Sequence, residues 1–419
     1  MTAAVGRGLT WGIAGVATAG VIARPFRLPE AVWAVAGAAL LVLLGLLPPG
    51  DAWAGVLKGL DVYLFLVGMM LLSEVARREG LFDTVAALAV NRARRSPRRL
   101  FLLVYAVGTV VTALLSNDAA AVVLTPAVFA AAKKARVEPL PYLFVCAFIA
   151  NAASFVLPIS NPANIVLYGD HTPPLGRWLA SFALPSAASI LATYGALRWA
   201  EGRHLGERCE GGLERPPLTA GGWTALAGIV LTAVALLAVS ALDRPLGLPT
   251  AILGGLTAAV VLVRTRTSPL PVLREISWAV LPLVAGLFVL VEGLDRTGVI
   301  GTLAGLLRAA AAASPDGAAW GAGALLAVAC NLMNNLPAGL VTSAALARAH
   351  PPQQVTDALL IGVDLGPNLS VTGSLATILW LTALRREGEH VGFWRFLRAG
   401  LVVMPPALVL ALAARLLVR

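Results

Sequence analysis

The chain consists largely of apolar runs that are long enough to cross a lipid bilayer. A helix needs roughly 20 residues to span the hydrocarbon layer, and runs close to that length recur from one end of the chain to the other. Because 58% of the residues are hydrophobic and 13% are charged, the sequence predicts an all-α polytopic membrane protein. The runs are 10–23, 31–48, 59–76, 140–168, 178–199, 220–242, 249–263, 278–294, 355–384 and 396–418.

Two further apolar regions, 99–132 and 318–349, are interrupted by polar residues in their middles. Non-helical backbone is tolerated at that depth only where protein or a water-filled cavity satisfies its polar groups. Each region is therefore predicted to be a re-entrant helical hairpin that enters and leaves on one face. Asn117 or Asp118 is predicted to cap the second half of the first hairpin, and Asn335 is predicted to cap that of the second.

The sequence also repeats itself at the scale of half the chain. Leu66–Ala86 aligns without gaps with Val284–Ala304, and the same register places Asn117 on Asn335. This similarity predicts a tandem duplication. Its parts are a first repeat at 8–200, a cytoplasmic linker loop at 201–217 and a second repeat at 218–419.

The charge distribution indicates how the chain is oriented. Each repeat is expected to contain five crossings, one hairpin and one broken helix, and an odd number of crossings forces the two repeats to be inverted. Placing both termini outside and the loop near Arg208 inside puts most of the 32 Lys and Arg residues on the cytoplasmic side. The net charge of +10 then reflects orientation in an inner (cytoplasmic) membrane with anionic lipids, and it requires no nucleic-acid partner.

The crossing that follows each hairpin is broken as well. Pro, Gly and Asn interrupt the helix at Leu157–Asn164 and at Leu365–Ser374. Four interruptions in two matching pairs are typical of a secondary transporter whose site lies between the repeats. Neutral polar side chains near the interruptions either bind a solute or satisfy loop backbone, and they are Ser116, Asn117, Asn151, Asn161, Asn164, Asn334, Asn335, Asn368, Ser370, Thr372 and Ser374.

Two carboxylates stand out among the 22 acidic residues. Asp118 and Asp364 are the ones predicted to lie deep in the membrane and away from helix ends. Ionisable groups at that depth are costly and usually functional, so both are candidates for proton coupling. The alternatives are a helix cap for Asp118 and a structural hydrogen bond to broken backbone for Asp364.

The interrupted segments resemble those of a known family. SNDAAAVVLTPAV, FIANAASFVLPISNPANIV, NLMNNLPAGLV and IGVDLGPNLSVTGSLATILWL are similar to motifs of the arsenite efflux permease family, within the larger ion-transporter superfamily. The resemblance covers nearly the whole chain. It implies export of arsenite or antimonite in exchange for protons, in some members with a cytosolic ATPase subunit as partner. It also implies that the hairpin tips and the broken helices bind the substrate. Asn151 departs from the family, because relatives often have Asp there.

Other functions are weighed against the same residues. A sodium/proton antiporter would use the same two carboxylates, and an exporter of silicic or boric acid would use the same neutral groups. A dicarboxylate symporter is disfavoured, because Asp118 at the hairpin tip would repel an anion. The sequence shows no nucleotide-binding loop and no paired His ligands, so neither an enzyme, a cofactor nor a metal site is expected.

Two minor expectations concern cysteines and surface charges. Cys146 and Cys330 are expected to behave as small apolar residues rather than as arsenic ligands. Charged residues spaced four apart are predicted to pair at the ends of two matching helices, and these pairs are Glu74 with Arg78 and Glu292 with Arg296.

Overall fold

The computed structural model describes residues 3–169, 172–206, 209–210 and 217–418, and in these residues all regular structure is helical. Seven of the described helices are long and apolar enough to cross a membrane, or up to nine if each of two bent pairs is one span. The prediction of an all-α polytopic membrane protein is thereby confirmed. Met1, Arg208 and part of the linker 201–217 lie outside the described residues.

The helices of the second half follow one another in the same order and with similar lengths as those of the first. The first series is α1 (Ala3–Ala23), α2 (Glu30–Leu43), α3 (Pro49–Lys58), α4 (Leu60–Arg78), α5 (Leu81–Arg92), α6 (Pro97–Leu114), η2 (Ala119–Leu124), α7 (Thr125–Lys134), α8 (Leu140–Ala152), η3 (Pro158–Ser160), α9 (Pro162–Tyr168) and α10 (Leu175–Glu201). The second is α11 (Ala220–Ala241), α12 (Gly247–Thr265), α13 (Pro269–Glu275), α14 (Val280–Arg296), α15 (Val299–Ala313), α16 (Pro315–Met333), α17 (Asn335–Ala349), α18 (Gln353–Leu365), η5 (Gly366–Asn368), α19 (Leu375–Arg386) and α20 (Phe393–Leu417).

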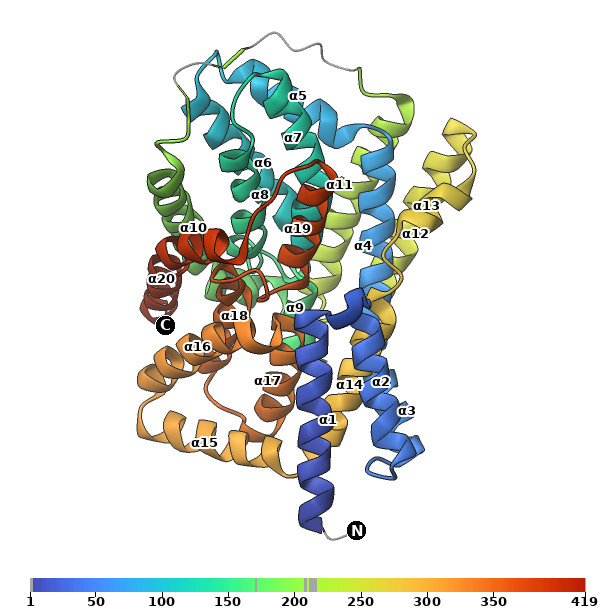
Figure 1. Cartoon of the computed structure of the whole chain (residues 1–419), viewed down its shortest axis with the longest axis vertical. Coiled ribbons are helices and arrows are strands. Elements are labelled where there is room, and N and C mark those ends of the chain that lie inside the picture. The colour runs from blue at the N-terminus through green and yellow to red at the C-terminus, as the bar shows by residue number, and fades with distance from the viewer. Residues whose placement is uncertain (1–2, 170–171, 207–208, 211–216, 419) are drawn as a thin grey trace.

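Each half contains two helical features that the hydropathy pattern missed. One is a bend, because α3 leads into α4 at 46° and α13 leads into α14 at 41°. The other is a helix that precedes each hairpin, α5 in the first half and α15 in the second. Figure 1 shows α15 lying across the lower end of the molecule, at a steep angle to α1. The run 31–48 is also shorter than predicted, because α2 ends at Leu43.

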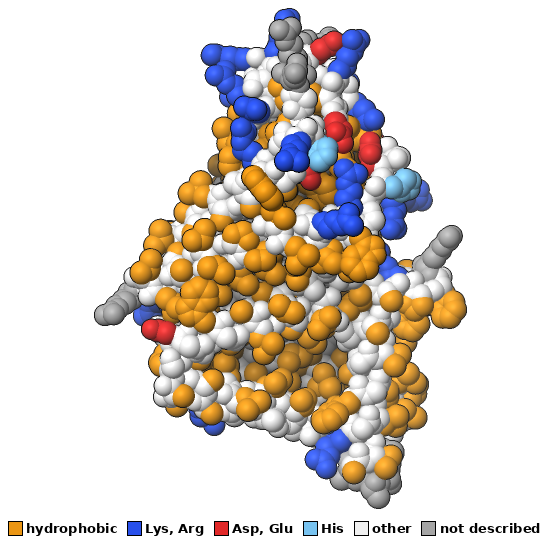
Figure 2. Space-filling view, turned by 60° about the vertical axis from the view of Figure 1, so that its left-hand side comes forward, with side chains coloured by type: hydrophobic (Ala, Val, Ile, Leu, Met, Phe, Trp, Pro, Cys, Tyr) orange, Lys and Arg blue, Asp and Glu red, His pale blue; other side chains and the backbone are white. Residues whose placement is uncertain are grey.

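The two interrupted apolar regions fold as helical hairpins. α6 and α7 form the first, α16 and α17 form the second, and the two lie toward opposite ends of the molecule (Figure 1). Figure 2 shows Lys and Arg side chains crowded at the upper end, above a broad hydrophobic surface. The upper end is therefore the one that the positive-inside rule assigns to the cytoplasm. The division into inverted repeats at 8–200 and 218–419 stays a prediction.

The broken helices occupy the centre of the bundle. All residues of α8 are buried, and so are most of those of α18. α18 lies against α16 where glycines let the two backbones approach each other. A Cβ atom at Gly362 would lie 2.3 Å from the carbonyl oxygen of Gly323, so no larger side chain fits without a backbone shift.

Gly362→Val is expected to lower the free energy of unfolding by about 2 kcal/mol, because overpacking forces packed helices apart. Thermal unfolding of the detergent-purified protein measures the change. Gly305→Ala is the matched control, since a Cβ atom at Gly305 on α15 meets nothing within 4 Å. Equal melting temperatures for Gly362→Val and the unmodified protein would show that the α16–α18 contact is looser than described.

Candidate functional site

The tip of the first hairpin is capped by Ser116. Its Oγ accepts a hydrogen bond from the backbone N–H of Ala119 at 3.4 Å. The prediction that Asn117 or Asp118 is the cap is wrong, because Asp118 already has helical dihedral angles (φ −64°, ψ −39°), whereas a cap residue lies just before the helix. Both side chains are thereby left for other partners. Asn117 is buried and Asp118 is partly exposed.

The tip of the second hairpin is capped by Asn334. Its Oδ1 accepts from the backbone N–H of Leu336 at 3.3 Å, and its Nδ2 donates to the carbonyl of Thr372 at 3.4 Å. The predicted cap, Asn335, is again one residue too late, because Asn335 is already the first helical residue of α17. The Asn335 backbone N–H donates to the carbonyl of Gly373 at 2.8 Å. The second tip is therefore bonded to the break that follows α18.

The two halves of the chain meet at a pair of polar side chains between the broken helices. Asn161 caps α9 by accepting from the N–H of Ala163 at 3.0 Å. Its Nδ2 donates to Oδ1 of Asp364 on α18 at 2.7 Å. The predicted site residues Asn161 and Asp364 are thus in direct contact, although they lie 203 residues apart in the sequence.

A second polar group holds the broken backbones together. Asn368 donates to the carbonyl of Phe148 at 3.0 Å and accepts from Asn151 at 3.0 Å. Ser374 caps α19 by accepting from the N–H of Thr377 at 3.1 Å, and its Oγ lies 3.3 Å from Oδ1 of Asn151. These predicted side chains therefore bind one another.

The remaining predicted residues also contact protein groups. Asn164 donates to the carbonyls of Ser154, Leu157 and Pro158, which fixes the irregular backbone before α9. Ser370 donates to Oδ1 of Asn331 at 2.8 Å, and Thr372 donates to the Asn331 carbonyl at 2.8 Å. Asn331 was not predicted as a site residue, since it lies one turn before the visible interruption.

A few polar atoms at the centre have no protein partner. Within the described part of the chain, Asn117 Oδ1, Asn164 Oδ1 and Asp364 Oδ2 are buried and accept no hydrogen bond. Buried polar atoms are nearly always paired, so such atoms call for a water molecule or a ligand. They mark where a polar solute could replace its lost hydration.

A cavity of about 90 Å³ reaches the first hairpin tip. Its polar lining consists of Ser116 and Asp118 of the tip, Glu74 near the end of α4, Glu275 at the end of α13 and Ser277 between α13 and α14. Its acidic lining faces the end of the molecule that is predicted to be cytoplasmic. Most of the lining is apolar, and Glu74 is paired with Arg77 and Arg78, so Asp118 is the carboxylate that most disfavours a small anion there.

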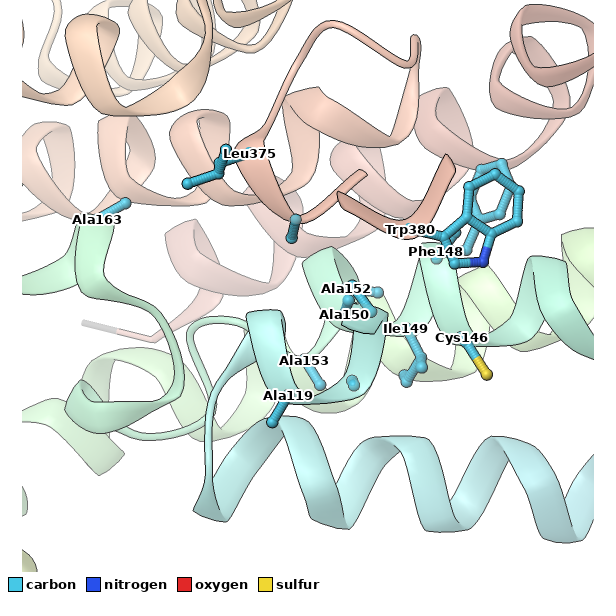
Figure 3. Packing of buried hydrophobic residues seen from close by; sticks show 14 of the residues in the cluster. Ala119, Cys146, Phe148, Ile149, Ala150, Ala152, Ala153, Ala163, Leu375 and Trp380 are labelled. Carbon is cyan, nitrogen blue, oxygen red and sulfur yellow. The ribbon is translucent and has the colours of Figure 1, made fainter. Parts of the chain in front are cut away.

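Small side chains let these segments lie close together. Figure 3 shows Ala119 of the first hairpin near Ala153, with Ala150 and Ala152 beside them and Ala163 across the centre. All five are almost completely buried. Close backbone approach through small residues is the usual way in which helices pack inside membranes.

One buried carboxylate was missed by sequence reasoning. Asp357 on α18 is fully buried, and its Oδ2 lies 2.7 Å from Nε of Arg415 on α20. Burial inside the protein is not the same as depth in the membrane, so the prediction that Asp118 and Asp364 are the deep carboxylates away from helix ends stays a prediction. Asp357 stands near the start of a helix in the sequence, and the arginine that compensates its charge lies 58 residues away. No local signal in the sequence shows that pairing.

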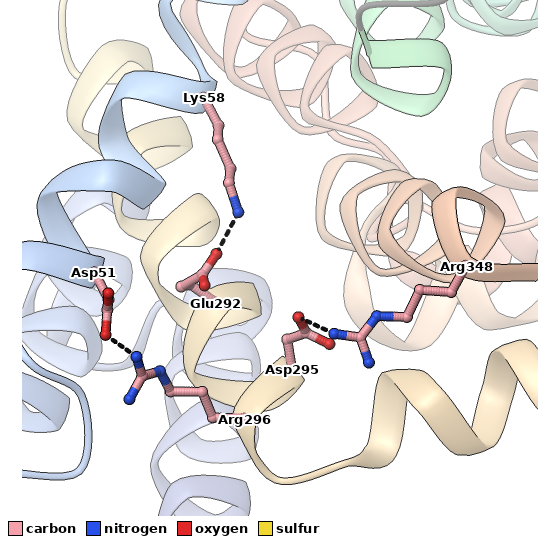
Figure 4. Close-up of polar contacts among 6 residues, drawn as sticks. All are labelled: Asp51, Lys58, Glu292, Asp295, Arg296 and Arg348. Carbon is pink, nitrogen blue, oxygen red and sulfur yellow. Dashed lines mark hydrogen bonds and ion pairs between the residues drawn. The ribbon is translucent and has the colours of Figure 1, made fainter.

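One of the two predicted surface ion pairs is present, and the other is not. Glu74 does bind Arg78, with 2.6 Å between Oε1 and Nε. Glu292 binds Lys58 at 2.6 Å instead of Arg296. Arg296 on α14 binds Asp51 on α3 instead. Figure 4 shows that α3 lies close enough to α14 for both of these pairs to form between the two helices.

The two membrane cysteines contact backbone carbonyl groups. Cys146 Sγ lies 3.6 Å from the carbonyl oxygen of Tyr142, and Cys330 Sγ lies 3.9 Å from that of Val363. Both side chains are fully buried. This packing agrees with the expectation of small apolar residues.

Hairpins and broken helices that meet around polar side chains define the class of protein: a polytopic membrane transporter. The citrate transporter family (CitMHS) matches residues 18–365. The arsenical pump membrane protein of Escherichia coli K12 is 30% identical over 94% of this chain and 95% of its own length, and that of Yersinia enterocolitica is 30% identical over 90% and 91%. The chain therefore belongs to the citrate transporter family (CitMHS), together with these arsenical pump membrane proteins. It is a multi-pass protein of the inner membrane.

Solved structures support the fold. The YdaH transporter of Alcanivorax borkumensis superposes with a TM-score of 0.57 at 18% identity, covering 88% of this chain and 86% of that one. MtrF of Neisseria gonorrhoeae superposes with a TM-score of 0.50 at 14% identity, covering 87% and 82%. At these identities the likeness concerns the arrangement of helices alone.

Proposed function

We propose that the protein is a secondary active transporter that exports arsenite and antimonite in exchange for protons. The observation that carries this proposal is the contact of Asp364 with Asn161 between the two broken helices. There a carboxylate oxygen is buried without a partner among the residues that the structure describes. A group of this kind can hold a proton in one state and release it in another. The relatives named as arsenical pumps support the choice of solute.

The proposed substrate contacts are narrower than the full set of polar residues at the interruptions. Asn117 and Asp364 offer acceptor atoms that no group in the described part of the chain uses, Asp118 lines the cavity, and Asn335 is the residue of the second tip that aligns with Asn117. Arsenous acid is neutral and carries three hydroxyl groups that can donate to such acceptors. Asn151, Asn368 and Ser374 are assigned to holding the broken backbones, because their side chains bind one another.

The residues that line the cavity also help to distinguish the competing solutes. Asp118 lines the route to the first tip, and its carboxylate disfavours citrate or another carboxylate as the solute. A sodium/proton antiporter and an exporter of silicic or boric acid remain the competing functions. Uptake of arsenite, antimonite, silicic acid, citrate and sodium into everted vesicles under an imposed pH gradient separates them. Uptake of sodium without arsenite would replace the proposed function by sodium/proton exchange.

Asn117→Ala and Asn335→Ala are expected to raise the apparent KM for arsenite about tenfold while expression stays normal. Loss of a buried hydrogen bond to the solute costs roughly 1–3 kcal/mol. Initial uptake rates in everted vesicles measure the change. Asn164→Ala is the contrasting variant, since its side chain holds three backbone carbonyls and its loss should reduce expression. An unchanged KM in both hairpin variants would remove the tips from the site.

A further inference from the structure

A buried polar cluster lies on the far side of the centre from the acidic cavity. Asp357 is fully buried and accepts hydrogen bonds from three side chains. Arg415 donates through Nε at 2.7 Å, Gln353 donates through Nε2 at 2.7 Å, and the hydroxyl of Tyr168 donates to the same oxygen as Gln353. We call these four residues the Asp357 cluster. Arg415 also donates to the carbonyl of Val418 at 2.7 Å.

A cavity of about 550 Å³ lies directly beyond this cluster. Arg415 and Gln353 line its inner wall, while Arg177 and Asp243 belong to other parts of the lining. The lining comes from the start of α10, the loop after α11, the start of α18 and the end of α20. The predicted orientation places these ends of the crossings toward the outer face of the membrane. We call this cavity the outer vestibule.

The Asp357 cluster is connected to the centre through a short helix. α9 is capped by Asn161, which binds Asp364, and it ends at Tyr168, which binds Asp357. Both carboxylates belong to α18 and are seven residues apart, so they lie on the same face of that helix. α9 is thereby tied to α18 at both of its ends. A rearrangement at Asp364 that moves α9 would also move Tyr168 away from the cluster.

The two ends of the molecule therefore differ. At the predicted cytoplasmic end the acidic cavity reaches the hairpin tip at Ser116 and Asp118. At the other end the outer vestibule stops at Arg415 and Gln353, with Asp357 buried behind them. An alternating-access transporter exposes its site to one side at a time.

We propose that the Asp357 cluster is the outer gate of the transport path. It holds α9, α18 and α20 together while the site is open to the cytoplasm, and its ion pair must break before solute passes into the outer vestibule. The assignment rests on the proposed transport function. It adds Asp357, Arg415 and Tyr168 to the chain's functional residues, as groups that position the path rather than bind the solute.

The test uses a thiol placed between the cluster and the centre. Ile361 is fully buried on α18, one turn from Asp357 and one turn from Asp364. Ile361→Cys is made in a full-length protein whose Cys146, Cys209 and Cys330 are replaced by alanine. A membrane-impermeant maleimide is then added to intact cells, which expose the outer face, or to everted vesicles, which expose the cytoplasmic face.

Combining Asp357→Asn with Arg415→Gln removes both charges, so no unpaired buried charge remains. This double variant is expected to be labelled from outside about tenfold faster than the parent, because the outward-open population rises. Tyr168→Phe, which removes one hydroxyl, should change the rate in the same direction. The control combines Arg177→Gln with Asp243→Asn, which alters the vestibule but not the cluster, and its labelling should match the parent.

If the thiol is labelled from outside at the same rate in the parent and the double variant, the proposed gate is overturned. The same holds if neither protein is labelled from outside. Faster labelling from both faces would show general loosening and would overturn it too, as would an equal acceleration in the control. Labelling requires no arsenite, whereas the proposed solute is tested by uptake. Failure of the gate and failure of the proposed function are therefore told apart.

Discussion

Accumulation of arsenite in everted vesicles is expected to disappear when Asp118 is replaced by asparagine. With a pH gradient of about one unit, each exchanged proton supplies about 1.4 kcal/mol, which sustains about a tenfold concentration ratio. Asp118→Asn should bring this ratio to about one, because an amide carries no exchangeable charge. Exchange of arsenite down its own gradient should continue, since Ser116 rather than Asp118 caps the helix and the tip keeps its shape. Uptake with and without the pH gradient measures both quantities.

Asp83→Asn is the matched control, because Asp83 is an exposed aspartate on α5 and lies outside the site. Its accumulation ratio should equal that of the unmodified protein. A ratio that stays at about tenfold in Asp118→Asn under the same gradient would exclude Asp118 as a proton carrier.

Replacing Asp364 by asparagine should abolish accumulation to the same extent. Asp364 is fully buried, and its Oδ1 accepts from Asn161 while its Oδ2 has no partner among the described residues. The amide oxygen of Asp364→Asn can still accept from Asn161, so the contact between α9 and α18 should survive. Uptake under the same pH gradient, together with thermal unfolding of the purified variant, separates loss of coupling from loss of fold.

A double variant sharpens this experiment. Asn161→Asp combined with Asp364→Asn moves the carboxylate across the same hydrogen bond and keeps the composition of the pair. It should recover part of the accumulation that Asp364→Asn loses. Normal accumulation with unchanged pH dependence in both Asp118→Asn and Asp364→Asn would contradict the coupling mechanism as a whole.

Much of the candidate site could be predicted because a helix interruption depends on the residues at the interruption itself. Pro, Gly and Asn within apolar runs located both hairpin tips and both broken helices, since such residues cannot continue a helix across hydrocarbon. The caps were predicted one or two residues too late, at Asn117 or Asp118 instead of Ser116 and at Asn335 instead of Asn334. The cap is the last residue with non-helical dihedral angles, and residue type alone does not fix that position between adjacent polar residues.

Partners of charged groups could not be predicted in the same way. Glu292 was assigned to Arg296 on its own helix, but it binds Lys58, because α3 bends toward α14. Asp357 was not recognised as deeply buried, because its partner Arg415 reaches it from α20. In each case the distance along the chain says nothing about the distance in space.

That the chain is a multi-pass membrane protein, where its helices break, and which family it resembles could all be predicted from the order of its residues. These properties follow from the length of apolar runs and from local backbone chemistry, which hold wherever the helices finally pack. The contacts of Asn161 with Asp364 and of Arg415 with Asp357 became visible only in the folded chain. Such contacts depend on how helices from distant parts of the chain cross, and close packing of small residues sets those crossings.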